Sequence, residues 1–227
     1  MSDAAANACV IDVWTCAHDP LRVLDAELDL LDDEERSRVE EFTSESARRT
    51  YIASHGFLRR VLGSHLGLDP AALRYDRRCE HCGHPHHGRP RLIGGLASFS
   101  LSHSGRHILI ALADGPVGAD IEDVTRRPVI DGVIRRCCGE RERAWLEGLA
   151  NRDRPAAFLG LWTKKEAVAK ALGLGLVLPF SSFEVTGPDP IRAREGAPPL
   201  AAWVVDVAGA VAAVAGTPGA VVYHHAP

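Results

Sequence analysis

Residues 99–122 read FSLSHSGRHILIALADGPVGADIE, and this stretch decides how the rest of the chain is interpreted. Apolar and small polar residues alternate over Phe99–Ser104, and His107–Ala113 is almost entirely apolar. A third run, Val117–Ile121, follows after a second glycine-containing turn. Runs of this kind, separated by tight turns, predict three short strands.

The third strand ends in two carboxylates on one face. Because residues two apart on a strand point to the same side, Ala119 and Ile121 face one way, and Asp120 and Glu122 face the other. Two neighbouring carboxylates repel each other, and a divalent cation held by oxygen ligands is the simplest group to place between them. The alternative is a strand end that dips into solvent. An isolated D-x-E pattern favours this alternative over a cation site. The choice therefore depends on residues elsewhere in the chain.

The composition is that of an ordinary globular chain. Of its 227 residues, 46% are apolar and 25% are charged, and the net charge is −4. This balance argues against a general attraction to nucleic acid or to an anionic membrane, and no apolar run reaches the ~20 residues of a membrane span. The N-terminus lacks the features of a signal peptide, so we expect a cytoplasmic location. The six cysteines are then expected to stay reduced.

Helical segments followed by strands occur twice along the chain. The first set comprises a strand at 10–15, an acidic helical region around 28–42, a helix at 44–67 and the strands quoted above. The second comprises a helical region at 129–149 broken near 137–139, a helix at 154–172, and strands at 180–185, 203–207, 211–215 and 221–224. HILIALAD (107–114) and AVAAVAG (210–216) read as equivalent strands. This order indicates an internal duplication.

The helix predicted at 154–172 carries a carboxylate on an apolar face. Leu159, Trp162 and Glu166 share one face of its 3.6-residue period, and Lys170 follows Glu166 at i+4. A lone carboxylate on such a face is costly unless it meets a cation or a strong donor. The alternative is an ordinary Glu–Lys pair at the rim of the helix, which contributes little.

A histidine-rich loop contains metal-ligand residue types at close spacing. Cys79 and Cys82 form a C-x-x-C pair, and His84, His86 and His87 follow. A structural zinc site normally has two ligand pairs separated by a longer loop, and the chain has no second C-x-x-C. The sequence therefore favours a reduced surface loop over a Zn²⁺ site at Cys79 and Cys82. A zinc-loop interaction module with a decayed catalytic site stays as the alternative function.

Four motifs in order resemble the 4′-phosphopantetheinyl transferases. V-G-x-D-x-E stands at 117–122, and W-[ST]-x-K-E-[AS]-x-x-K stands at 162–170. G-[KR]-P at 88–90 and F-[NS]-x-S-H-S at 99–104 also fit, and a G-x-G-L-x-L-P run at 173–179 follows. Two departures are Ala119, where a β-branched residue is usual, and Arg89, where Lys is commoner and the charge but not the geometry is kept.

The resemblance implies a fold and an assembly. The length is similar to that of the Sfp-type enzymes rather than the shorter, trimeric holo-acyl-carrier-protein synthases. We therefore expect an α+β fold: a pseudo-dimer of two similar α/β subdomains, each with helices packed on a small antiparallel sheet. The expected subdomains are 1–115 and 116–227, with the metal and catalytic carboxylates in the second. The chain is expected to be a monomer that binds coenzyme A between the halves.

The resemblance also implies the roles of individual residues. Asp120, Glu122 and Glu166 would hold Mg²⁺, which Mn²⁺ could replace. Glu166, Lys170 and Asp120 form the expected catalytic set. Glu166, directly or through a metal-bound water, would take the proton of the attacking carrier serine, and Lys170 with Lys165 would neutralise phosphate charge. The residues expected to contact coenzyme A are Arg38, Arg49, His87, Gly88, Arg89, Pro90, Ser102, His103, Lys165 and Lys170.

The implied reaction moves the 4′-phosphopantetheine arm of coenzyme A to a serine of an apo carrier protein and releases 3′,5′-ADP. The expected partners are acyl or peptidyl carrier domains and coenzyme A, with no nucleic acid and no membrane. The Sfp-type resemblance suggests a role in polyketide, nonribosomal-peptide or siderophore synthesis. The sequence names neither the carrier nor the pathway.

Overall fold

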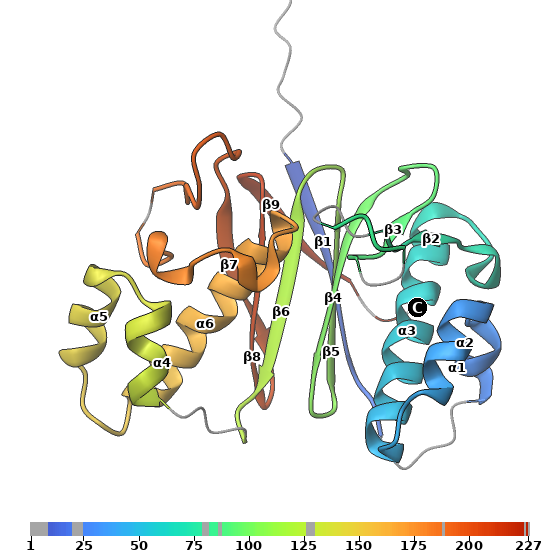
Figure 1. Ribbon diagram of the computed structural model, residues 1–227, viewed down its shortest axis with the longest axis horizontal. Coiled ribbons are helices and arrows are strands. Elements are labelled where there is room, and N and C mark those ends of the chain that lie inside the picture. The colour runs from blue at the N-terminus through green and yellow to red at the C-terminus, as the bar shows by residue number, and fades with distance from the viewer. Residues whose placement is uncertain are drawn as a thin grey trace, which may run out of the picture.

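The molecule consists of four layers, in the order helices, sheet, sheet, helices, as seen in a computed structural model (Figure 1). The structure describes residues 9–19, 25–78, 82–85, 88–125, 130–187, 189–224 and 226. The two sheets lie back to back in the centre, with α3 on the outer side of one sheet and α6 on the outer side of the other. This arrangement confirms the predicted α+β fold.

The helices and strands alternate along the chain in two similar blocks. The strands are β1 (Cys9–Ala17), β2 (Tyr75–Asp76), β3 (Arg91–Leu92), β4 (Ser98–Ser104), β5 (His107–Ala113), β6 (Val117–Asp123), β7 (Ala201–Val207), β8 (Ala210–Gly216) and β9 (Gly219–His224). The helices are α1 (Asp25–Leu30), α2 (Asp33–Glu40), α3 (Glu45–Leu66), α4 (Ile130–Cys137), α5 (Glu140–Glu147) and α6 (Arg154–Ala171). Short 3₁₀ helices are η1 (Pro70–Ala72), η2 (Gly175–Val177) and η3 (Phe180–Ser182).

The sheet topology confirms the internal duplication. The first sheet has the strand order β4-β5-β1-β9, and the other large sheet has the order β6-β8-β7. In both, an antiparallel hairpin (β4–β5 or β7–β8) pairs through its second strand with the strand that opens the block (β1 or β6). The strands β5 and β8 are thus equivalent, as the sequence indicates. We refer below to β1–β5 as the N-terminal half and to β6–β8 as the C-terminal half.

The last strand does not follow this symmetry. β9 pairs in parallel with β1, from Cys9 opposite Gly219 to Trp14 opposite His224. The pairing therefore crosses the predicted boundary at 115/116, because the final strand of the chain lies in the sheet of the first half. The boundary itself stays a prediction.

Local sequence signals define the long helix of the N-terminal half. The Ser44 hydroxyl caps α3 by accepting a hydrogen bond from the Ala47 N–H, and Gly67 ends it in the left-handed region with φ 66°. A serine at the start is typically worth about 1 kcal/mol, and glycine adopts the left-handed conformation without a steric cost. These two residues explain why the predicted helix at 44–67 is found with nearly the same bounds.

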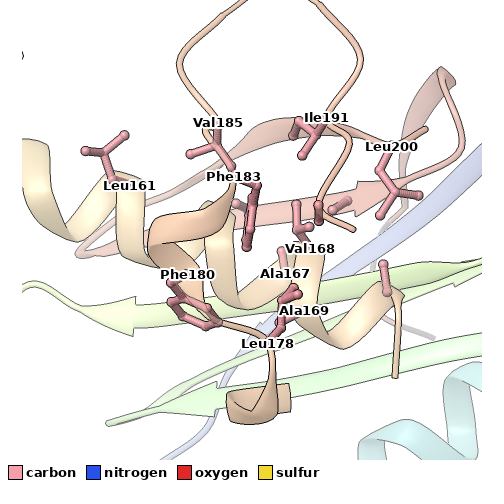
Figure 2. Close-up of a cluster of buried hydrophobic side chains, with 14 of the residues drawn as sticks. Leu161, Ala167, Val168, Ala169, Leu178, Phe180, Phe183, Val185, Ile191 and Leu200 are labelled. Atoms are coloured by element: carbon pink, nitrogen blue, oxygen red, sulfur yellow. The ribbon is translucent and has the colours of Figure 1, made fainter. Parts of the chain in front are cut away.

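Both outer cores contain aromatic side chains. The core under α3 contains four large rings, from Trp14, Phe57, Tyr75 and Phe99. On the other side, Figure 2 shows Phe180, Phe183 and Leu178 beside α6. The contact of α6 with β6 itself is made by small residues. A Cβ on Gly118 would lie 1.9 Å from the Ala167 carbonyl oxygen, so the absent side chain lets the helix backbone touch the strand.

Each half also buries one cation of its long helix. Arg59 on α3 is fully buried, lies 2.7 Å from Glu35 and 2.6 Å from Asp32, and donates to the carbonyls of Pro70 and Leu73. Its charge is therefore paired and its donors are used, which is what burial of a guanidinium requires.

The C-terminal half repeats this arrangement with a lysine. Lys165 on α6 is fully buried, lies 2.7 Å from Glu142 and donates to the carbonyls of Phe180 and Phe183. The strand predicted at 180–185 is wrong for this reason: the chain forms η3 there and turns two carbonyls onto the ammonium instead of a neighbouring strand.

None of the helices in the described ranges is both long and apolar enough to cross a membrane.

Candidate functional site

The two halves meet along a seam between β4 and β6, and three serines of β4 span it. Ser100, Ser102 and Ser104 lie on one face of β4 because they are two residues apart. Their hydroxyl oxygens accept hydrogen bonds from the backbone N–H groups of Ala119, Ile121 and Asp123, at 2.9, 3.4 and 3.1 Å. The N–H groups along this edge of β6 therefore donate to serine hydroxyls, whereas in a continuous sheet they would donate to the carbonyls of a neighbouring strand.

Two of these serines also contact the carboxylates predicted from the sequence. Ser102 Oγ donates to Asp120 Oδ1 at 3.0 Å, and Ser104 Oγ donates to Glu122 Oε2 at 2.9 Å. Lys170 Nζ reaches the same place from α6, at 2.6 Å from Asp120 Oδ1 and 3.1 Å from Ser102 Oγ. The close approach of α6 at Gly118 makes this contact possible, because it brings the helix against β6.

These side chains line one pocket of about 350 Å³. Its lining residues come from β4, β6 and α6, and are Leu101, Ser102, His103, Asp120, Ile121, Glu122, Trp162, Glu166 and Lys170. Trp162, Glu166 and Lys170 are four residues apart on α6, which confirms the predicted shared face. The pocket lies between the two halves, since β4 belongs to one and β6 and α6 belong to the other.

The electrostatics of the pocket favour the arrival of positive charge. Burial raises the pKa of Asp120, although the Lys170 ammonium and the Ser102 hydroxyl act in the opposite direction. Burial also raises the pKa of Glu166, and the negative charge of Asp120 adds to this effect. Three carboxyl groups thus share a poorly solvated site in which Lys170 is the cation in direct contact.

The donor set fits a hard divalent cation. Asp120 Oδ2 is buried and has no hydrogen-bond partner within the described residues. The other oxygen, Oδ1, accepts from Ser102 and Lys170. A buried carboxylate oxygen without a partner is costly, and a cation would satisfy it. Within the described ranges, no three Asp, Glu, His or Cys side chains already form a closed metal-binding group. Lys170, rather than a third carboxylate, lies against Asp120 in this structure.

Of the predicted site residues, six meet in this pocket: Ser102, His103, Asp120, Glu122, Glu166 and Lys170. The structure does not bring Lys165 there. Lys165 precedes Glu166 by one residue, which turns its side chain by about 100° around the helix, and it is buried against Glu142 instead. We therefore leave Lys165 out of the site.

The predicted turn 88–90 has a role in holding the halves together. The Arg89 guanidinium donates to the carbonyls of Lys170, Val117 and Phe99, at 2.7 Å for the first and 2.9 Å for the second. These carbonyls belong to α6, β6 and β4, so one side chain ties three elements of the seam. Gly88 is required by a close approach, since a Cβ there would lie 2.4 Å from the Arg78 carbonyl oxygen. Neither Gly88 nor Pro90 lines the pocket.

The N-terminal arginines lie apart from the pocket lining. Arg38 pairs with Glu41 at 2.7 Å, and Arg49 pairs with Glu45 at 2.7 Å. Their predicted contact with coenzyme A stays a prediction.

The predictions for the histidine-rich loop fall largely on undescribed positions. His87, predicted to line the adenine, lies outside the described residues, as do Cys79 and His86. Cys82 and His84 are described and exposed. The Zn²⁺ alternative therefore stays a prediction.

The sequence-based site list omits Leu101, Ile121 and Trp162, which line the pocket, and Ser104, which lies beside it. Trp162 lines it, and its position on the face of Glu166 was the available signal. Ser104 contacts Glu122 from outside the lining, and the signal was the serine at every second position from 100 to 104. A larger pocket of about 720 Å³, lined by residues of 174–182 and 192–197, contains none of the predicted site residues.

Comparisons with known proteins agree on one family. Residues 116–215 match the family described as the 4′-phosphopantetheinyl transferase superfamily, and this range includes Asp120, Glu122, Glu166 and Lys170. The chain is similar to the 4′-phosphopantetheinyl transferase HetI of Nostoc sp., with 32% identity over 147 residues, which cover 64% of this chain and 61% of HetI. It is also similar to the 4′-phosphopantetheinyl transferase Sfp of Bacillus subtilis, with 29% identity over 161 residues, which cover 70% of this chain and 67% of Sfp. The match thus spans less than two thirds of the length of HetI.

Proposed function

The chain belongs to the 4′-phosphopantetheinyl transferase superfamily, and on that premise we propose that it moves the phosphopantetheine arm of coenzyme A to a serine of an apo carrier protein. One observation carries the proposal. Asp120, Glu122, Glu166 and Lys170 line a single pocket at the seam of the two halves. This set combines oxygen ligands for a hard cation with a cation for phosphate, as transfer of a phosphate group requires.

The chemistry divides among these residues. Glu166 accepts the proton of the carrier serine, directly or through a metal-bound water. The serine oxygen then forms a bond to the β-phosphorus of coenzyme A. The bond from that phosphorus to the bridging oxygen breaks, and 3′,5′-ADP leaves with the electron pair. The product is a phosphodiester on the carrier.

Lys170 neutralises phosphate charge in this scheme. Its ammonium is partly exposed and lies at the edge of the pocket, 2.6 Å from Asp120. Asp120, Glu122 and Glu166 would hold Mg²⁺, or Mn²⁺ in its place, and the ion would supply further positive charge for the pyrophosphate. The partnerless Asp120 Oδ2 supports this assignment.

The remaining parts of coenzyme A would extend from the pocket along the seam. Ser102 and His103 on β4 are assigned to the 3′-phosphate region, which their place in the pocket lining supports. The turn 88–90 is assigned to the adenine, and it is joined to the same seam through Arg89.

We further propose a cytoplasmic monomer that serves polyketide, nonribosomal-peptide or siderophore synthesis. The duplicated halves support the monomer, because one chain already supplies both sides of the seam. The broad assignment to acyl and peptidyl carriers is what the family resemblance implies, and it is compatible with the general transferase name that the relatives carry. A narrower type of transferase acts on acyl carriers alone. The assay with a set of different carriers, described next, distinguishes it from the general type.

The direct test is a transfer assay read by intact mass. Purified protein is incubated with coenzyme A, Mg²⁺ and apo carrier domains from fatty-acid, polyketide, nonribosomal-peptide and siderophore synthesis. We expect at least one carrier to gain the mass of one phosphopantetheine arm. No gain on any carrier would contradict the proposal.

Three controls define the reaction. A carrier with its acceptor serine replaced by alanine should gain nothing, which shows where the arm is attached. Removal of divalent ions with a chelator should stop transfer, and added Mg²⁺ or Mn²⁺ should restore it. Transfer that survives chelation would remove the metal from the scheme while leaving the transferase activity in place.

A further inference from the structure

We propose that Ser104 is a positioning residue that orients the Glu122 carboxylate for the metal and coenzyme A site. The inference rests on the proposed function and adds a residue to it, because Ser104 does not line the pocket. It depends on the direction of two hydrogen bonds at one hydroxyl group.

Within the described residues, the Ser104 hydroxyl has one acceptor for its proton, the Glu122 carboxylate. Its oxygen accepts the N–H of Asp123 at 3.1 Å and lies 2.9 Å from Glu122 Oε2. An ionised carboxylate only accepts, so the hydroxyl must donate to it. The backbone N–H therefore fixes the hydroxyl from one side and turns its proton toward Glu122 on the other. Asp123 follows Glu122 directly on β6, so both hydrogen bonds of the Ser104 hydroxyl go to neighbouring residues of the same strand.

The surroundings make the contact restrictive. Ser104 is 3% exposed, so water does not compete freely for its hydroxyl. Glu122 lies near the end of β6 and is only half-buried, so its longer side chain has more freedom than that of Asp120. Asp120 has two partners, Ser102 and Lys170. Glu122 has Ser104 as its one hydrogen-bond partner within the described residues.

Ser100 provides a matched control on the same strand. It is also buried, and its hydroxyl accepts the N–H of Ala119 at 2.9 Å. In the part of the chain that the structure describes, it donates to no carboxylate. Replacing Ser100 or Ser104 by alanine therefore removes one hydrogen bond to the β6 backbone in each case, and only the second replacement also releases a carboxylate.

The experiment compares Ser100→Ala and Ser104→Ala with the parent protein. Mn²⁺ binding is measured by electron paramagnetic resonance with the metal alone, and thermal unfolding is measured in parallel. Loss of an outer partner of a metal ligand commonly weakens metal binding by 10–100-fold. We expect Ser104→Ala to weaken Mn²⁺ binding by about 10-fold, Ser100→Ala to change it by less than about 2-fold, and both to lower the unfolding temperature to a similar extent.

The outcomes separate this inference from the proposed function. Equal effects of the two variants on Mn²⁺ binding, no effect of Ser104→Ala, or no Mn²⁺ binding by the parent protein would overturn the role of Ser104. Transfer to carriers is assayed separately on the parent protein. If that protein binds Mn²⁺ with the expected ranking of variants but modifies no carrier, the proposed function fails and the positioning role stands.

Discussion

The equivalent strands β1 and β6 complete their outer edges in different ways. β1 is paired along its length by the backbone of β9, in a regular parallel ladder. β6 instead receives the hydroxyl groups of Ser100, Ser102 and Ser104. A backbone ladder uses every group at the edge, whereas a serine has one further hydrogen bond to give. Two of the three serines give theirs to carboxylates, which explains why the site lies on this edge.

The register of the two sheets shows what each half has kept. Asp120 and Glu122 pair with the fourth and second residues of β8, Ala213 and Val211. The residues opposite the fourth and second positions of β5 are Trp14 and Cys16. An aromatic ring and a thiol thus occupy the N-terminal positions that correspond to the two carboxylates.

The long helices differ at matching positions as well. When the buried Arg59 is aligned with the buried Lys165, Trp162 corresponds to Gly56 and Glu166 corresponds to Arg60. A Cβ on Gly56 would lie 2.6 Å from Glu27 Cβ, so α1 packs directly onto that position. The N-terminal half has therefore closed the place that corresponds to the pocket. The two halves share their structure, and the three carboxylates and Lys170 of the pocket all come from the C-terminal half.

The sharpest test of this difference is Glu166→Gln against Arg60→Gln. The first removes the base and a proposed metal ligand while it keeps the shape, and we expect transfer to fall by about 10³-fold in kcat/KM. The second changes the corresponding residue of the other helix, which pairs with Glu27 away from the pocket, and should leave transfer nearly unchanged. Steady-state kinetics of both variants is measured with one apo carrier that the parent protein modifies. Near-normal activity of Glu166→Gln would remove that residue from the mechanism.

The buried cations test whether the two halves are held together alike. Lys165→Met leaves the buried Glu142 without a cation and should lower the free energy of unfolding by about 3–5 kcal/mol. Arg59→Met removes one cation from Glu35, which keeps His55 at 2.9 Å and Arg77 at 3.2 Å, so its loss should be smaller. Urea denaturation provides the measurement. Replacing both members of the C-terminal pair, Lys165→Met with Glu142→Leu, should recover only part of the loss, because the buried N–H groups of Gly139 and Val185 then lose their acceptor. If Lys165→Met unfolded normally but bound coenzyme A weakly, the lysine would belong to the phosphate site after all.

A smaller effect is expected from the contact that brings α6 against β6. Gly118→Ala places a methyl group 1.9 Å from the Ala167 carbonyl oxygen, so the helix has to move away from the strand. A displacement of this kind can reduce turnover by roughly 100-fold even when every catalytic side chain is present. Gly160→Ala is the matched control, because a Cβ at that position of α6 meets open space. Equal activity of the two variants would show that the close approach is not required.

The smallest expected effect concerns the pH dependence of stability. Because the pKa of Glu166 is raised above its ordinary value of 4.5, ionising it in the folded state costs stability. That cost is present above the raised folded pKa and disappears as the pH falls through it to below 4.5. Glu166→Gln should therefore unfold at a higher free energy than the parent protein at pH 7, by less than about 1 kcal/mol, and the two should converge near pH 4.

Glu35 in the N-terminal half should show the opposite slope. Burial acts to raise the pKa of Glu35, but His55 and Arg59 outweigh it, and the net pKa is lowered. Its stabilising contribution is present above the ordinary pKa and is lost as the pH falls through the lowered folded value. Unfolding curves of Glu166→Gln between pH 4 and 7, and of Glu35→Gln from about pH 5 down to about pH 2, measure both slopes. Slopes of the same sign would show that the two carboxyl groups are not in different environments.

Much of the site could be predicted from the sequence because its polar residues follow the periodicity of the strand or helix that carries them. The alternation in 99–104 and 117–122 places serines and carboxylates on definite strand faces, and the helical period places Glu166 with Lys170. The caps at Ser44 and Gly67 made the long N-terminal helix predictable in the same way. Each of these inferences uses only neighbours along one element.

The remaining features depend on contacts between distant elements. Lys165 adjoins Glu166 in sequence, and only the position of Glu142 decides that its ammonium is buried away from the pocket. Residues 180–185 have strand-forming composition, but two of their carbonyls are used by that ammonium. The contacts of Arg89 with three backbone carbonyls likewise come from distant elements, and its predicted contact with coenzyme A stays a prediction. Propensity and periodicity carry no information about such partners.

The parallel pairing of β9 with β1 has a consequence for the order of folding. Residues 9–14 pair with residues 219–224, so the edge of β1 cannot be completed until nearly all of the intervening chain has been synthesised. Contacts of such long sequence separation form slowly, because a large loop must be closed before they stabilise anything. Until then β1 presents an open edge of the kind that recruits strands from other molecules. We expect β9 to pair with β1 late in folding. Deletion of β9 should therefore cause aggregation during refolding before it changes the pocket.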